Sequence, residues 1–542
     1  MSKKQSKYGG SSSDPKQKHT ICMVSDFFYP NMGGVEMHIW CLGQCLIQRG
    51  HKVIVVTHCY EGRQGIRYMT NGLKVYYLPL MVFHDQVIFP TLYAFFPLFR
   101  NILIREQITI VHGHQSISSL TNECILYART MGYRTCYTDH SLFGFADIAS
   151  ININKALTAT LSDIDHVICV SHTCRENLSL RAAIHPSMVS AIPNAVDCTK
   201  FIPDPSKRYP TNTINIVLLS RLVYRKGIDL LVKVIPLVCS KVNNVHFIIG
   251  GDGPKKLLLE EMREQYSLHD RIELLGAVPH HKVRDVLVRA HIFLNCSLTE
   301  AFCIALLEAA SCGLFVVSTK VGGVPEVLPP SMIKFAEPDV ESLYDALVEA
   351  ISISRRIIPS EMHERVKSMY HWTDVAKRTE IVYNNIANTR KASLAERLIR
   401  YSTIGPFSGF AMCCIVASLH LLWRCCEWIW PAVDVEIAAT PMLIGGLNGS
   451  PTGGASPRYS VRGGSSSGGG LYRTIRSSSG STARYATTAA GNSSGHSVET
   501  EGMEENMLGI SHRGFRSTAA SATTSGTINS IDSSGGGGGT GS

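Results

Sequence analysis

The feature that most constrains the fold of this 542-residue chain is a recurrence of short apolar runs separated by helix-like segments. Such spacing is typical of parallel strands joined by helices. The runs form two sets. The first covers residues 20–28, 52–58, 108–112 and 167–171, and the second, after a proline-containing stretch, covers residues 214–220, 245–250, 272–275, 292–296 and 315–318. The sequence therefore predicts an α/β protein of two Rossmann-like domains that face each other across a cleft.

Segments of different composition flank the predicted domains. We place an N-terminal domain at 19–200, a C-terminal domain at 211–370, and C-terminal helices with a basic juxtamembrane segment at 371–406. Residues 1–18 are polar and basic and lack the apolar core of a signal peptide, so we expect them to be disordered and the domains to be cytosolic. Residues 440–542 are rich in glycine and serine without an apolar period, and we expect a disordered tail. That tail mixes arginines with acidic residues, so the net charge of +9 indicates no nucleic-acid partner.

A mostly apolar segment at 407–431 predicts a transmembrane helix. Its length is about that needed to span a bilayer, and its tryptophans suit one membrane interface. Basic residues before it favour a cytosolic side for its N-terminal end, which predicts a lumenal tail. Arg424 and Glu427 interrupt its end, so an interfacial or re-entrant helix remains the alternative to a single span. The basic residues are Arg390, Lys391, Arg397 and Arg400, opposed by Glu396.

The sequence TEAFCIALLE at 299–308 places two carboxylates eight residues apart at the start of an apolar segment. An ionised Glu308 inside such a segment is unfavourable unless a ligand or partner satisfies it. Apolar runs on both sides place the pair at a strand-to-helix turn, where ligands bind in parallel sheets. The alternative is that Glu300 is an exposed first-turn carboxylate and that Glu308 pairs with a structural arginine.

Together with the glycine-containing STKVGGVPEVLP at 318–329, this segment resembles the Glu-x7-Glu signature of retaining nucleotide-sugar glycosyltransferases with the GT-B fold. The chain is most similar in sequence to the PIG-A family, the catalytic subunits of phosphatidylinositol N-acetylglucosaminyltransferase, over about residues 20–438. The resemblance implies transfer of N-acetylglucosamine from UDP-GlcNAc to phosphatidylinositol with retention of configuration, the first step of GPI-anchor synthesis. It also implies an endoplasmic reticulum membrane location and a multi-subunit complex. Another lipid-directed transferase, such as a mannosyltransferase, and a non-catalytic nucleotide-sugar-binding scaffold remain alternatives.

Two motifs offer groups that suit a diphosphate. Gly33 and Gly34 precede a helix, whose N-terminal amides bind anions, although such a pair is often only a tight turn. Arg221 and Lys226 lie in SRLVYRKG after the first strand of the second domain, where solvated surface charge is the ordinary explanation. By resemblance, these two cations neutralise the diphosphate of the donor and its developing charge as it departs.

Two further motifs come from the resemblance to the family. In GGDGP at 250–254, Gly251 and Gly253 line the nucleotide site, the alternative being an ordinary glycine turn. His140, in TDHSLFGFAD, matches the cleft histidine that contacts the transferred sugar. We assign it to the active site and name no side-chain nucleophile.

The carboxylates also take roles by resemblance. Glu300 touches the hydroxyls of the transferred sugar, and Glu308 accepts hydrogen bonds from the nucleotide ribose. The amides of Ala301, Phe302 and Cys303 at the helix start assist. We expect no metal and no cofactor, because arginine and lysine replace the metal in this fold and because the cysteine spacing indicates neither zinc nor disulfides. The Asp-x-Asp at 163–165 is interpreted as a coincidence, since it precedes a strand.

Residues 79–99 form an apolar, aromatic segment with Asp85, Pro90 and Pro97 inside it, which makes a poor membrane span. Core filling is the default interpretation. A functional hypothesis is that this segment dips into the bilayer surface to receive a lipid.

Overall fold

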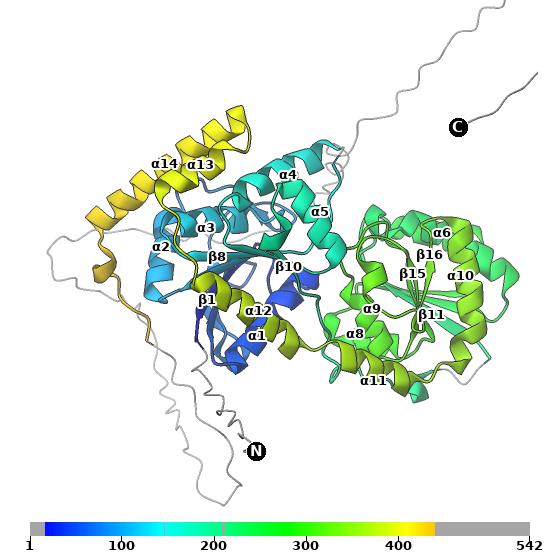
Figure 1. Ribbon diagram of the computed structural model, residues 1–542. Coiled ribbons are helices and arrows are strands. Elements are labelled where there is room, and N and C mark those ends of the chain that lie inside the picture. The colour runs from blue at the N-terminus through cyan, green and yellow to red at the C-terminus, as the bar shows by residue number, and fades with distance from the viewer. Residues whose placement is uncertain (1–16, 146, 209–211, 440–542) are drawn as a thin grey trace, which may run out of the picture. The chain divides into compact units, whose positions relative to one another are not determined.

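The computed structural model describes residues 17–145, 147–208 and 212–439. These residues contain two separate, mainly parallel sheets with helices on both faces, as the sequence predicts (Figure 1). The predicted disorder at 1–18 and 440–542 lies, apart from residues 17 and 18, outside the described residues.

The N-terminal sheet has eight strands in the order β10-β9-β8-β7-β1-β2-β4-β3. Neighbouring strands are parallel except β3 and β4. The strands are β1 (Thr20–Val24), β2 (Lys52–His58), β3 (Gly65–Tyr68), β4 (Lys74–Leu78), β7 (Ile110–His114), β8 (Arg134–Asp139), β9 (His166–Cys169) and β10 (Val189–Ala191). A separate antiparallel hairpin is formed by β5 (Val82–His84) and β6 (Val87–Ile88).

Helices cover both faces of this sheet because side chains alternate along each strand. Ile21 and Met23 of β1 pack in a core with α1 (Gly34–Gln48) and α12 (Trp372–Ala387). Cys22 and Val24 of β1 pack in a second core on the other face, with α2 (Phe96–Arg105), α3 (Ser119–Thr130) and Leu419 of α14 (Pro406–Ile429). Helix α12 thus returns the chain to the N-terminal sheet after the second sheet is complete. The remaining helices of this part are α4 (Ile148–Leu161), α5 (His172–Ala182) and α13 (Leu394–Ser402).

The C-terminal sheet has six parallel strands in the order β13-β12-β11-β14-β15-β16. The strands are β11 (Ile214–Leu219), β12 (Val245–Gly250), β13 (Ile272–Gly276), β14 (Ile292–Asn295), β15 (Phe315–Thr319) and β16 (Ile333–Ala336). One face packs against α6 (Ile228–Lys241), α7 (Lys256–Gln265) and α10 (Val340–Ile353). The other packs against α8 (His280–Leu287), α9 (Ile304–Ser311) and α11 (Pro359–Met369).

Two arginines of the basic segment before α14 form ion pairs within the protein. Arg397 of α13 is buried, and its Nε donates to Asp163 over 2.6 Å, while Nη1 of Arg400 donates to the same carboxylate over 2.8 Å. Arg129 also pairs with Asp163 and with Asp165. These arginines therefore hold α13 on the N-terminal domain, and both carboxylates of the Asp-x-Asp sequence are occupied by arginines.

The apolar segment at 79–99 divides into two parts. Phe95, Phe96 and Phe99, at the start of α2, are buried in the core, so the default interpretation is right for them. Met81 and Phe83, on the β5–β6 hairpin and its approach, are 68% and 64% exposed.

Candidate active site

The carboxyl ends of β11, β14 and β15 bring three sequence motifs together, because these strands are neighbours in the C-terminal sheet. β11 leads into the loop that contains Arg221 and Lys226, and β14 leads into the loop that contains Glu300. β15 leads into the glycine loop with Gly322 and Gly323. The amide of Gly323 donates to the carbonyl oxygen of Glu300 over 2.9 Å.

Lys226 and Glu300 form an ion pair. The hydroxyl of Ser297 donates to the same carboxylate over 2.8 Å. Burial works to lower the pKa of Lys226, but the carboxylate of Glu300 outweighs burial and raises it. Lys226 is therefore held as a cation. The side chain of Glu300 is only 12% exposed and precedes α9, so it is not an exposed first-turn carboxylate.

Glu308 lies on α9 and is one of the residues that line a narrow cavity. Its Oε1 lies 3.5 Å from Nε2 of His280, and the carboxylate is 14% exposed. Met37 of α1 and Trp372 of α12 also line this cavity. Among the described residues no arginine forms an ion pair with Glu308. The carboxylate thus remains available to hydroxyl groups of a ligand.

Further charged residues lie near Lys226, in the loop that follows β11. Burial and the neighbouring Arg221 both lower the pKa of Arg225, with Glu300 and Asp85 opposing them. Burial raises the pKa of Glu36, on the first turn of α1, and Arg221 acts against this. The sequence prediction of Arg221 and Lys226 therefore missed Arg225, a third cation three residues before α6.

The glycines at 251 and 253 hold two loops against each other. A Cβ at Gly251 would lie 1.9 Å from the carbonyl oxygen of Ser220, and one at Gly253 would lie 2.6 Å from that of Leu222. Both glycines have φ near +150°, which other residues rarely adopt. The backbone of both glycines therefore lies close to the loop that contains Arg221, and the glycines fix the position of that loop and its cations, Arg221 and Lys226.

The glycines at the start of α1 lie in a different environment. Gly33 is the N-cap of α1 with extended backbone, and a Cβ there would meet the carboxylate of Glu36. A Cβ at Gly34 would meet nothing within 4 Å. The start of α1 is therefore open at Gly34, as an approaching ligand requires.

The residues between Glu300 and α9 offer backbone rather than side chains. Ala301 and Phe302 are buried, and the ring of Phe302 packs edge-on against Tyr370 with centroids 6.0 Å apart. Cys303 is the N-cap of α9 with a left-handed φ of 69°. Burial raises the pKa of its thiol, so the thiol is not a thiolate nucleophile.

His140 packs against the buried His38 and His114, at the carboxyl ends of β7 and β8. Its Nε2 is 3.4 Å from Nδ1 of His114, and its ring packs edge-on against His38 with centroids 4.6 Å apart. Burial, reinforced by His38 and His112, places the pKa of His140 well below its usual range. At neutral pH His140 is therefore an uncharged hydrogen-bonding group.

The same histidines are the metal-ligand group found among the described residues. One ring nitrogen each of His38, His114 and His140 lies within 4.8 Å of the others. Nδ1 of His38 is already bonded to Asn194 over 2.7 Å. The metal-independent chemistry expected from the sequence remains a prediction.

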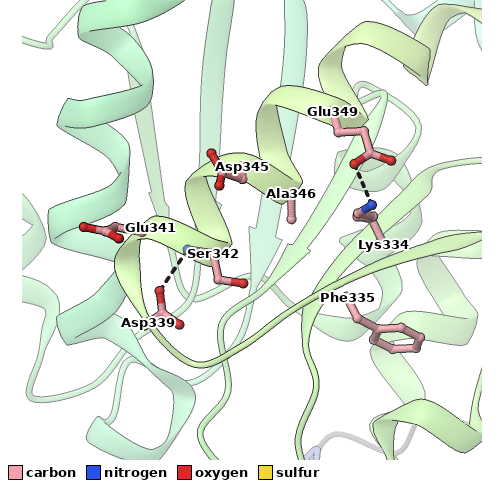
Figure 2. Close-up of a pocket in the computed structure, with 8 residues that line it drawn as sticks. All are labelled: Lys334, Phe335, Asp339, Glu341, Ser342, Asp345, Ala346 and Glu349. Carbon is pink, nitrogen blue, oxygen red and sulfur yellow. Dashed lines mark hydrogen bonds and ion pairs between the residues drawn. The ribbon is translucent and has the colours of Figure 1, made fainter.

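A hollow of about 440 Å³ elsewhere on the C-terminal domain is not a diphosphate site. Figure 2 shows that α10 lines it with carboxylates, and that the one cation labelled there, Lys334, pairs with Glu349. Acidic walls repel a diphosphate. None of the predicted site residues lines this hollow.

The sequence analysis missed several groups of the site. Ser297 and His280 contact the two glutamates, and His38 and His114 contact His140. The available signal was the spacing of His112, which ends the predicted run 108–112, and His114 two residues later, since contacts between distant loops leave no local pattern.

Comparison with known proteins agrees with this arrangement. Residues 58–147 match the family model described as PIGA (GPI anchor biosynthesis), and residues 203–368 match the model described as glycosyl transferases group 1. Among solved structures, sucrose-phosphate synthase from Thermosynechococcus elongatus is similar with a TM-score of 0.58 and 18% identity, covering 68% of this chain and 99% of that one. Anabaena HepE in complex with UDP is similar with a TM-score of 0.55 and 14% identity, covering 68% and 100%. These likenesses confirm the GT-B fold.

Sequence relatives match more than three-quarters of this chain. A phosphatidylinositol N-acetylglucosaminyltransferase subunit from Arabidopsis thaliana is 57% identical over 421 residues, which cover 78% of this chain and 94% of the relative. The human protein of the same name is 54% identical over 430 residues, covering 78% and 88%. The chain therefore belongs to the PIG-A family of GT-B glycosyltransferases.

Proposed function

We propose that this protein transfers N-acetylglucosamine from UDP-GlcNAc to the inositol of phosphatidylinositol, the first step of GPI-anchor biosynthesis. The observation that carries the proposal is identity above 50% to subunits named for this transferase, along about nine-tenths of their length. The cations and carboxylates at the carboxyl ends of β11 and β14 supply groups that this reaction needs.

The mechanism that we propose is electrostatic and metal-independent. Arg221 and Lys226, with Arg225 beside them, stabilise the negative charge that develops on the UDP diphosphate as the sugar leaves. Glu300 holds Lys226 in its charged form and offers its second oxygen to the sugar hydroxyls. Glu308 accepts hydrogen bonds from the ribose. UDP departs and the inositol hydroxyl attacks on the same face of the sugar, which gives retention of configuration.

The uncharged His140 positions the transferred sugar in this proposal. A neutral imidazole both donates and accepts one hydrogen bond, which suits a sugar hydroxyl. Its neighbour His114 is neutral as well, because burial lowers the pKa of His114 well below the usual value. The histidine group therefore adds no charge that would oppose the positive character of the sugar carbon in the transition state.

The proposed location is the cytosolic face of the endoplasmic reticulum membrane, with α14 as the membrane element. Among the described residues α14 is the one helix long and apolar enough to cross a bilayer. The word "subunit" in the names of the relatives supports assembly with other proteins in a transferase complex. The single span and lumenal tail remain predictions from the sequence.

The test is transfer of labelled GlcNAc from UDP-GlcNAc to phosphatidylinositol in membranes that lack the endogenous enzyme. We expect the full chain to restore transfer and the Glu308→Ala variant not to. Glu349→Gln is the matched control, since this carboxylate lies on the same domain and pairs with Lys334 outside the site. UDP binding without turnover in the assembled complex would instead indicate a scaffold, and transfer only from another donor would indicate a different transferase.

A further inference from the structure

Four histidines gather at the carboxyl ends of β7 and β8, and their ring nitrogens are not equally satisfied. His112 and His114 lie on β7, and His140 follows β8. His38 of α1 packs against the rings of His114 and His140. Both ring nitrogens of His112 lie 2.7 Å from hydroxyl groups, one on α12 and one on β8. His112 is therefore fully hydrogen-bonded within the core.

His38 and His114 each keep one ring nitrogen without a partner. Nε2 of both residues is buried and forms no hydrogen bond, and the two side chains belong to residues that are 2% and 0% exposed. Buried polar atoms are normally hydrogen-bonded, so each exception needs an explanation. Nδ1 of His38 lies 2.7 Å from Oδ1 of Asn194, and an amide oxygen only accepts. Nδ1 therefore carries the proton, and the unpartnered Nε2 of His38 presents a lone pair.

The distances among these rings suit a metal ion better than they suit hydrogen bonds. Nδ1 of His114 lies 3.4 Å from Nε2 of His140, whereas hydrogen bonds prefer about 2.7–3.2 Å. Two imidazole nitrogens on one tetrahedral zinc ion, each about 2.0–2.1 Å from it, lie about 3.3–3.4 Å apart. One ring nitrogen each of His38, His114 and His140 lies within 4.8 Å of the others. A point between them is thus at most about 2.8 Å from all three, and shifts below about 1 Å would reach bonding distance.

We propose that His38, His114 and His140 bind a divalent transition-metal cation such as Zn²⁺, and that the bound cation inhibits sugar transfer. Imidazole nitrogens suit Zn²⁺, and Asn194 holds His38 in one tautomer as the partners of metal-bound histidines do. The cation enters from the side of His140, which is the partly exposed member of the three. The three ligands include no carboxylate to offset the charge of the cation, so we expect reversible binding rather than a resident ion.

Occupancy of this site takes His140 away from the transferred sugar. A ring nitrogen that binds a metal has no lone pair left for a sugar hydroxyl. A dication beside the sugar also opposes the positive charge that develops on the sugar carbon in the transition state. This inhibition, unlike the binding itself, rests on the proposed function of His140. Zn²⁺ should therefore lower the rate of transfer without being needed for it.

Binding of the metal alone tests the site directly. The full chain, purified in detergent and freed of metal with a chelator, is titrated with Co²⁺, whose visible absorption reports its ligands. We expect a band typical of nitrogen ligands, without the charge-transfer absorption of thiolates, that Zn²⁺ abolishes. His38→Gln should weaken this binding by about tenfold or more. His112→Gln is the matched control, because it removes a buried histidine that is not a ligand. An unmodified chain without the band, or the same affinity in His38→Gln, would overturn the inference.

A second variant leaves all three ligands in place. Asn194→Ala removes the hydrogen bond to Nδ1 of His38, and loss of such a partner weakens metal binding by about 10–100-fold. This variant keeps the test decisive if His38→Gln fails to fold, which its melting temperature shows. Unchanged affinity in Asn194→Ala would contradict a site that includes His38.

Transfer of labelled GlcNAc separates this inference from the proposed reaction. In membranes that contain the full chain, Zn²⁺ should inhibit transfer and EDTA should restore it. Mg²⁺ is the control ion, because it prefers oxygen ligands and should not inhibit. Asn194→Ala should need about 10–100-fold more Zn²⁺ for the same inhibition. Equal sensitivity of this variant would overturn the inhibitory role. No transfer even without Zn²⁺ would count only against the proposed reaction and leave the binding result standing.

Discussion

At the scale of single residues, the ion pair of Lys226 with Glu300 joins two sequence motifs that lie 74 positions apart. The ammonium group is mostly buried and is kept charged by one carboxylate. The same cation is proposed to stabilise the leaving diphosphate, so it has to exchange part of its contact with Glu300 for the donor.

Replacing Lys226 with methionine tests this role. We expect kcat for transfer to fall by about 10²–10³, as for removal of a preorganised donor to developing charge. Lys255→Met is the matched control, because Lys255 pairs with Asp229 over 3.0 Å on the same domain. Initial rates over a range of UDP-GlcNAc concentrations separate kcat from KM. An equal loss in both variants would contradict a specific role for Lys226.

Glycine at 251 is needed for the backbone and not only for ligand approach. Gly251→Ala should destabilise the protein by about 2–3 kcal/mol, because the added Cβ clashes with the carbonyl oxygen of Ser220 and φ is strained. Gly34→Ala should leave the melting temperature unchanged, since its Cβ meets no atom within 4 Å. Thermal unfolding followed by intrinsic fluorescence compares the two. A lower melting temperature for Gly34→Ala would argue against an open helix start.

At the scale of elements, β7, β8 and α1 bring a histidine group into the N-terminal core. Burial lowers the pKa of His38 to about 4 and that of His112 to about 3. In the unfolded chain these groups titrate near 6.5. Between those values the unfolded chain binds more protons than the folded one, so the free energy of unfolding falls as the pH falls below about 6.5.

The slope for each such histidine is about 1.4 kcal/mol per pH unit between pH 6 and 4. We therefore expect the melting temperature to drop steeply from pH 7 to pH 5, and to drop less in His38→Gln. His281, which is exposed on α8, gives the control His281→Asn, with the same drop as the unmodified chain. A similar acid dependence in His38→Gln would show that other groups dominate.

The sequence predicted the central strands well because they are apolar throughout. β1, β2, β11, β12, β14 and β15 lie where the apolar runs predict them. β4 was not predicted, since KVYYL mixes polar residues into a short strand whose burial depends on its neighbours. The pairing of Arg397 with Asp163 was equally invisible, because residues 234 positions apart leave no local pattern.

At the scale of the whole molecule, Glu326 of the C-terminal glycine loop caps α5 of the N-terminal domain. Its carboxylate accepts from the amides of His172 and Thr173 over 2.7 and 2.8 Å. Partial burial would raise the pKa of Glu326, but these donors, together with the Thr173 hydroxyl, outweigh it and lower the pKa. The contact links the loop behind Glu300 to the opposite domain.

Glu326→Gln should weaken this contact and raise KM for UDP-GlcNAc roughly threefold, a modest effect because the pair is exposed. The variant should leave kcat near its original value, since Glu326 does not reach the reacting groups. Steady-state kinetics in membranes measure both constants, with Glu349→Gln as the control. A fall in kcat with unchanged KM would contradict a role in holding the domains together.

The return of α12 to the N-terminal sheet means that the C-terminal domain is inserted within the N-terminal one. Trp372, Val375 and Tyr383 of α12 are built into the core that contains β1. The polypeptide therefore passes between the domains twice, once in each direction. Two connections allow the domains to rotate relative to each other about one axis, and they restrict rotation about the others. A single proteolytic nick in either connection would leave both halves attached, and only cleavage of both would release the inserted domain.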